Sequence, residues 1–232
     1  ITAEWKVNEY TITFDTAGGT PIEPITQDYD TPITEPADPT KTGYTFVGWD
    51  TDIPEKMPAE DITITAEWKV NEYTITFVTG DNAVVVAPIT DSYKQEVTLP
   101  TPTRVGYTFN GWYVEGNEET LYKGKYAMPL DGETLLASWT ANKYTITFNA
   151  NGGSNVEAIT QDYATAVTAP VNPTKVGYTF AGWTYNGSAY TFTTMPVEDI
   201  ELVANWTINQ YTISFDSNGG SEVDTITNNY GE

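Results

Sequence analysis

The chain has 232 residues, a formal net charge of −22, a hydrophobic share of 39% and neither cysteine nor histidine. Without these two residue types, disulfide frameworks, zinc–thiolate sites, cysteine nucleophiles and Ser-His-Asp arrangements are excluded. The acidic balance argues against nucleic acid and anionic membranes as partners, whereas an aromatic share of 13% is enough for packed cores.

One pattern recurs along the chain and predicts its domain organisation. The sequence of residues 1–14 returns unchanged at 64–77, and weaker copies of its second half occur at 142–148 and 209–215. Self-similarity at a period of 63 to 71 residues indicates tandem modules. We therefore expect the end of a preceding repeat at 1–9, three repeats at 10–72, 73–143 and 144–210, and the start of a further repeat at 211–232.

The first repeat predicts four strands, taken in chain order as 10–14, 24–29, 44–49 and 62–68. Large apolar residues alternate with threonine in the first of these, as is typical of a half-buried strand, and Gly18-Gly19 ends it in a turn. Pro39 and Gly43 enclose a segment that suits a single helical turn, because proline is favoured at the first helical position and glycine beyond the last. Only residues 69–72 separate the last strand from the next repeat.

The repeats differ in net length only between a Gly-Trp tryptophan and a later methionine. The tryptophan-to-methionine separation is 8 residues in the first repeat (49 to 57), 16 in the second (112 to 128) and 12 in the third (183 to 195). Steps of four fit a β-hairpin of adjustable length, because two extra residues per strand keep every side chain on its face. Asn186-Gly187 predicts the tip of the third hairpin and residues 116–117 that of the second, while the first hairpin is nearly absent.

Aromatic residues outside the repeated positions gather in these variable hairpins. They are Tyr113, Tyr122, Tyr126, Tyr185, Tyr190 and Phe192. Two interpretations stay open. Tyrosines among glycine, asparagine and serine on a loop are typical of a recognition surface, which makes the six candidate partner-binding residues. Cross-strand aromatic pairs also stabilise an exposed two-stranded ribbon.

No pattern predicts a catalytic residue, a metal site or a cofactor site, so we expect a protein that is not an enzyme. The acidic clusters lack the ligand spacing of a calcium hand and are interpreted as solvated charge. A basic position recurs as Lys41, Arg104 and Lys175, but the arginine excludes an isopeptide nucleophile common to all repeats. All seven tryptophans occupy repeated positions, which favours core packing over a carbohydrate-stacking platform.

Together these elements resemble a known family. YTITF, a Gly-Gly turn, P-T-K-x-G-Y-T-F-x-G-W and a final I-T-A-E-W are similar to the Listeria–Bacteroides repeat, also called the internalin B-type B-repeat. The resemblance implies small β-grasp-like modules in tandem, between a tip domain and a wall anchor of a bacterial surface protein, with no catalytic residues. We expect a mainly β fold, α+β at most, with four to five strands and at most a one-turn helix per module, in an elongated rod.

The expected function is a non-catalytic, extracellular stalk at the cell surface, attached to the wall through other parts of the parent protein. One alternative is an adhesive module that binds a host protein or glycan through the variable hairpins. Another is self-association into a fibre through exposed strand edges. We expect no nucleic acid partner and no membrane insertion in this segment.

Overall fold

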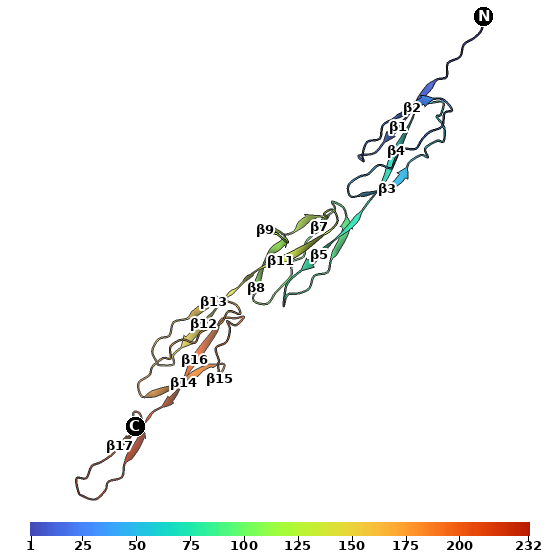
Figure 1. Cartoon of the computed structure of the whole chain (residues 1–232). Coiled ribbons are helices and arrows are strands. Elements are labelled where there is room, and N and C mark those ends of the chain that lie inside the picture. Colours follow the sequence, from blue (N-terminus) through green and yellow to red (C-terminus); the bar gives the residue numbers. More distant parts are fainter. The chain divides into compact units, whose positions relative to one another are not determined.

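The computed structural model describes all of residues 1–232, and every regular element in it is a β-strand (Figure 1). Two compact units form, one from residues 1–80, 85–101 and 111–137 and the other from 81–84, 102–110 and 138–232. A helix with the length and apolar character needed to cross a membrane is absent. The prediction of a mainly β fold made of small sheets is confirmed.

The first repeat is a four-stranded mixed sheet. Its strands are β1 (Glu9–Asp15), β2 (Ile25–Asp28), β3 (Tyr44–Trp49) and β4 (Ile62–Val70), in the order β2-β1-β4-β3. The two central strands pair in parallel with Ile12 opposite Ile62, and both edge strands pair antiparallel. This order, with parallel first and last strands at the centre, is β-grasp-like, but an extended segment replaces the helix between β2 and β3.

The second and third repeats keep this order and add strands in the variable segment. The second contains β5 (Glu72–Val78), β6 (Ile89–Ser92), β7 (Glu96–Thr98), β8 (Tyr107–Val114), β9 (Asn117–Tyr122), β10 (Lys125–Ala127) and β11 (Glu133–Ala141). The third contains β12 (Lys143–Asn149), β13 (Ile159–Asp162), β14 (Tyr178–Tyr185), β15 (Ser188–Ala189) and β16 (Ile200–Ile208). Their five-stranded sheets run β6-β5-β11-β8-β9 and β13-β12-β16-β14-β15, and β7 pairs separately with β10. A two-stranded sheet of β17 (Gln210–Ile213) and β18 (Ile226–Asn229) follows.

Each hairpin tip is a two-residue loop. In the third repeat Tyr185 pairs with Ser188, and Asn186 and Gly187 have φ of 49° and 81°, so the predicted turn is confirmed. In the second repeat Val114 pairs with Asn117, which places the loop at residues 115–116. The predicted tip at 116–117 was wrong by one residue, because Gly116, at φ 83°, supplies the positive φ at the end of the loop and leaves Asn117 in the strand.

The predicted helical turn before β3 is also wrong. The Tyr44 N–H donates to the Lys41 carbonyl oxygen at 3.0 Å, and Gly43 between them has φ 79°. Such a positive φ at the third residue defines a type II β-turn and stops a right-handed helix. The Lys41 Nζ donates to the Ala17 carbonyl oxygen at 2.8 Å and lies 4.5 Å from the Tyr44 ring centroid. The recurring basic position therefore ties this turn to the Gly-Gly turn.

Most of the repeated tryptophans lie in or against the cores, as predicted. Trp112 is 0% and Trp183 5% exposed. Trp68 and Trp206 are half-buried, and each donates its Nε1–H to a backbone carbonyl oxygen of the turn after the first strand at 3.0 Å. Trp5 is the exception at 93% exposed, because residues 1–8 pair with no strand and no core surrounds the ring.

The second glycine of the Gly-Gly turn is required by packing against tryptophan. A Cβ added at Gly153 would lie 2.5 Å from Trp206 Cζ2 and 3.1 Å from the Thr174 carbonyl oxygen. We expect Gly153→Ala to lower the free energy of unfolding by about 1–3 kcal/mol, the usual cost of overpacking. Urea unfolding followed by tryptophan fluorescence measures this. Gly220→Ala is the matched control, since Gly220 occupies the same position with no tryptophan beside it. Equal losses in both variants would contradict the packing explanation.

Candidate functional site, the joint between successive repeats

A single asparagine connects each repeat to the next. β4 ends at Val70 and β5 begins at Glu72, which leaves Asn71 alone between them, and Asn142 and Asn209 hold the same place. The connection predicted at 69–72 is therefore shorter than expected. Lys69 and Val70 still pair with β3, and Glu72 already pairs with β6, so the ladders of both repeats continue up to the asparagine.

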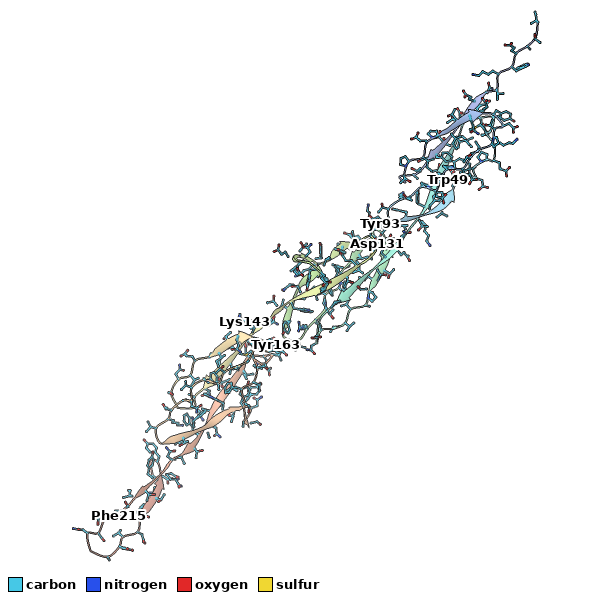
Figure 2. All side chains as sticks on the ribbon, viewed as in Figure 1. Trp49, Tyr93, Asp131, Lys143, Tyr163 and Phe215 are labelled. Carbon is cyan, nitrogen blue, oxygen red and sulfur yellow. The ribbon has the colours of Figure 1, made fainter.

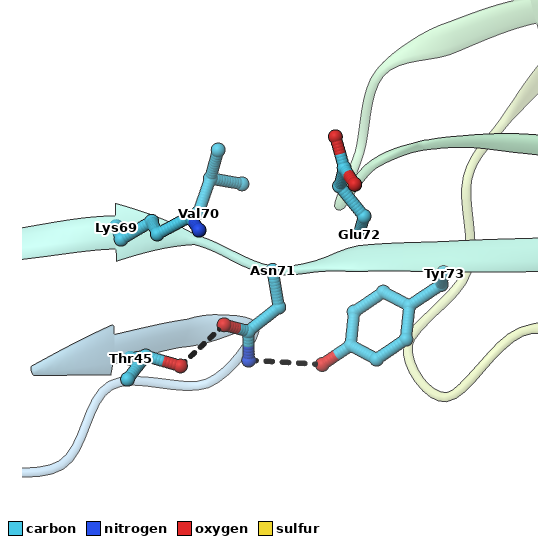
Figure 3. A pocket seen from close by; sticks show the side chains of 6 residues that line it. All are labelled: Thr45, Lys69, Val70, Asn71, Glu72 and Tyr73. Atoms are coloured by element: carbon cyan, nitrogen blue, oxygen red, sulfur yellow. Dashed lines mark hydrogen bonds between the residues drawn. The ribbon is translucent and has the colours of Figure 1, made fainter.

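Asn71 is hydrogen-bonded to both of the repeats that it joins. Its backbone N–H donates to the Gly43 carbonyl oxygen at 2.9 Å, and its own carbonyl oxygen accepts from the Tyr93 N–H at 2.8 Å. Its side-chain Oδ1 accepts from the Thr45 hydroxyl at 2.6 Å, and Nδ2 donates to the Tyr73 hydroxyl at 3.4 Å (Figure 3). Gly43 and Thr45 precede the joint, whereas Tyr73 and Tyr93 follow it. One residue thus satisfies its polar groups within the chain, using partners on both sides.

The next two joints repeat these bonds. Asn142 donates to the Gly106 carbonyl oxygen at 2.9 Å and accepts from the Tyr163 N–H at 2.8 Å and the Thr108 hydroxyl at 2.6 Å. At Asn209 the same three bonds measure 2.9, 2.8 and 2.6 Å, with Gly177, Tyr230 and Thr179 as partners. The same three bonds therefore satisfy the backbone and side chain of the connecting asparagine at all three places.

A tyrosine ring of each following repeat packs on a glycine of the preceding one. A Cβ at Gly106 would overlap the Tyr163 ring, and the ring lies edge-to-face with Tyr107 at 5.7 Å between centroids (Figure 2 labels Tyr163). The same contacts join Gly43 and Tyr44 to Tyr93, at 6.5 Å between the rings. The glycine of the Gly-Tyr pair therefore supplies both the positive φ of the turn and the space for the ring. Such edge-to-face pairs add about 0.5–1.5 kcal/mol to the burial of the rings.

Ion pairing contributes little at the joint. Lys143, directly after Asn142, lies 2.9 Å from Asp162, but the two side chains are 68% and 47% exposed. Exposed pairs of this kind stabilise proteins by about 0–1 kcal/mol and are screened by salt. The joint is therefore held by hydrogen bonds and ring packing, and we expect its stability to change little with ionic strength.

The candidate residues of the second hairpin contact one another. Tyr122 and Tyr126 lie edge-to-face with 4.9 Å between ring centroids, and the Tyr126 hydroxyl donates to the Glu133 carboxylate. Burial, and then this hydrogen bond to Glu133, raise the pKa of Tyr126 above its ordinary range. Tyr113 is half-buried on β8. These contacts favour the ribbon-stabilising interpretation, while the partner-binding hypothesis stays a prediction.

The candidate residues of the third hairpin pack against the core of their repeat. Tyr190 and Phe192 lie edge-to-face at 5.2 Å, and Phe192 approaches Phe148 of β12 at 6.3 Å. Burial raises the pKa of Tyr190. The Tyr185 hydroxyl donates to Glu198 at 3.3 Å. The three rings thus cover the repeat that carries them, and their role toward a partner also stays a prediction.

A change at the joint tyrosine tests whether neighbouring repeats stabilise one another. We expect Tyr163→Ala to lower the free energy of unfolding by about 1–3 kcal/mol. This is less than the cost of truncating a fully buried ring, because Tyr163 is half-buried. Tyr29→Ala is the matched control, since Tyr29 holds the same position, is 50% exposed and contacts the Tyr10 ring but no glycine of a preceding repeat. Urea unfolding measures both. A cost as large for Tyr29→Ala as for Tyr163→Ala would show that the ring acts within its own repeat.

Comparisons with known proteins agree with the repeat pattern. The sequence profile of the Listeria-Bacteroides repeat domain matches residues 10–67, 73–137 and 144–205, so Asn71 and Asn142 lie between the matched segments. A protein of Evansella cellulosilytica with the provisional name Gly-rich membrane protein is 33% identical over 237 residues, which are 97% of this chain and 27% of that protein. Internalin H of Listeria monocytogenes is 38% identical over 130 residues, 52% of this chain and 23% of that protein.

The chain spans about a quarter of the length of these two relatives. Among solved structures, domains 3-4 of Streptococcal High Identity Repeats in Tandem from a cell surface protein are 19% identical and cover 56% of this chain and 96% of their own. Their TM-score of 0.24 is too low to carry an argument about the fold. The family profile, by contrast, accounts for most of the sequence in three successive copies. The chain belongs to the Listeria-Bacteroides repeat domain family.

Proposed function

We propose that the chain is a non-catalytic, extracellular spacer of a bacterial surface protein, in which each joint holds neighbouring repeats in a semi-rigid arrangement. The joint carries this proposal, because one asparagine is bonded to the turn before it and to the sheet after it in the same way at three places. A flexible linker of several residues would let the modules reorient freely, whereas one residue bonded on both sides leaves few free torsions.

The topology of each repeat suits a spacer. First and last strands are central and parallel, so the chain enters a repeat at one end of its sheet and leaves at the other. Adding a copy then adds length, and stability becomes a sum of repeat and joint contributions. The net charge of −22 opposes association between neighbouring chains at high local density.

Family membership and composition support the remaining parts of the proposal. The relatives include proteins named internalin and membrane protein, which supports a place at the cell surface. Neither histidine nor cysteine is present to act as general base or nucleophile, which supports a non-catalytic role. Adhesion through the variable hairpins and self-association through strand edges are the alternatives. Adhesion predicts binding to a host protein or glycan that is lost when the hairpin tyrosines are replaced, and self-association predicts a mass that rises with concentration.

Distance distributions between spin labels test the spacer directly. One label at Thr26 in the first repeat and one at Thr134 in the second are expected to give a single narrow distribution by pulsed electron resonance. Asn71→Gly combined with Tyr93→Ala should broaden it, because the side-chain bond to Thr45 and the ring packing on Gly43 are lost. Tyr29→Ala serves as the control and should leave the distribution unchanged. A distribution in the unsubstituted chain as broad as in the joint variant would overturn the proposal.

A further inference from the structure

The first repeat lacks the hairpin whose aromatic rings help to bury the Gly-Trp tryptophan of the third repeat. In the third repeat Phe192 and Tyr190 pack against the core cluster that contains Trp183, and that tryptophan is only 5% exposed. Trp112 of the second repeat is 0% exposed. Trp49 occupies the same position but is only half-buried, because residues 50–56 form no strand and contribute no aromatic ring.

A groove of about 390 Å³ opens beside this tryptophan. Phe46 and Trp49 form one wall, with 5.3 Å between their ring centroids in an edge-to-face arrangement, and Ile53 adds an aliphatic surface. Three carboxylates belong to the same lining, those of Glu35, Asp38 and Asp52. No lysine or arginine lines the groove.

The three carboxylates form no hydrogen bond or ion pair with the rest of the repeat. Elsewhere in this repeat, Asp61 accepts the Thr11 N–H at 2.7 Å and Asp50 accepts the Thr65 N–H at 2.8 Å. The residues of the groove, Glu35, Asp38 and Asp52, are exposed and take part in no such bond and in no ion pair. Aromatic surface and unpaired negative charge therefore face the same space.

This combination matches a cationic side chain. A lysine or guanidinium group over an aromatic face gains cation–π attraction, and neighbouring carboxylates add charge-assisted hydrogen bonds. The protein already pairs cations with rings, since Lys41 Nζ lies 4.5 Å from the Tyr44 centroid and 5.6 Å from that of Trp68. The overall charge of −22 would draw a basic partner toward the chain.

We propose that the groove beside Trp49 binds an arginine or lysine side chain presented by an exposed basic segment of a partner protein. The first repeat then combines the spacing role with recognition, at a place that aromatic rings of the longer hairpin cover in the third repeat. The site is separate from the joint and does not depend on the spacer proposal.

The test is a titration of the ¹⁵N-labelled chain with acetyl-Arg-Arg-Arg-amide at physiological ionic strength. The indole N–H resonance of Trp49, assigned with Trp49→Phe, is expected to shift in a saturable manner. A variant with Glu35→Gln, Asp38→Asn and Asp52→Asn should weaken binding about tenfold, as the loss of several charge contacts predicts. The matched control carries Glu119→Gln, Glu157→Gln and Glu201→Gln, which removes the same charge from exposed positions of the second and third repeats, outside the groove, and should weaken binding less than about threefold.

A second variant covers the groove and removes Asp52, but it keeps Glu35 and Asp38. Replacing residues 50–56 by residues 184–194, the hairpin of the third repeat, should bury Trp49 and abolish its shift. The proposal is overturned if the two charge variants weaken binding equally, because attraction to the acidic surface would then be non-specific. It is also overturned if Trp49 does not respond to the peptide, or if the neutral sugar cellohexaose shifts Trp49 and the peptide does not, which would assign the groove to a glycan.

Discussion

The parallel pairing of the first and last strands is the constraint on which the architecture of each repeat depends. It places both strands at the centre of the sheet, where Ile12 and Ile64 are fully buried. Two parallel neighbours run in one direction, so the chain cannot return to the end at which it entered. The next repeat must therefore start where the last strand leaves the sheet, which makes the joint a consequence of the topology.

The joint shows that a position repeated in every copy can serve the neighbouring copy as well as its own core. Gly43 shapes a turn in the first repeat, yet the ring that requires its missing side chain belongs to Tyr93 of the second. The asparagine bonds likewise join groups on both sides. We therefore expect neighbouring repeats to stabilise one another, as in a one-dimensional array with nearest-neighbour coupling.

The length of the variable hairpin determines how much of the core around the Gly-Trp tryptophan is covered in each repeat. Its aromatic rings cover the core around Trp183 in the third repeat, whereas the short segment of the first leaves Trp49 beside an acidic groove. Because the hairpin lies outside the central parallel pair, its length can vary without disturbing the sheet. A uniform frame can thus present different surfaces from repeat to repeat, which is how function is commonly placed on a shared fold.

Local pattern determined much of this protein. Alternation at residues 10–14 and 62–68 predicted the strands, and Asn186-Gly187 predicted a hairpin tip. Internal repetition predicted the tandem modules, and the resemblance of the repeated motifs to a known repeat indicated the family. Only the tertiary structure decided the contacts between residues distant in sequence. The segment predicted as a helical turn at 39–43 ends in a type II β-turn. The strands extend up to Asn71 on both sides, and the Tyr93 ring packs on Gly43, which lies fifty residues earlier in the sequence. An asparagine recurs in the sequence two residues before the first tyrosine of each repeat. Periodicity within one strand cannot reveal a partner across a joint, because hydrogen bonding and ring packing depend on spatial proximity.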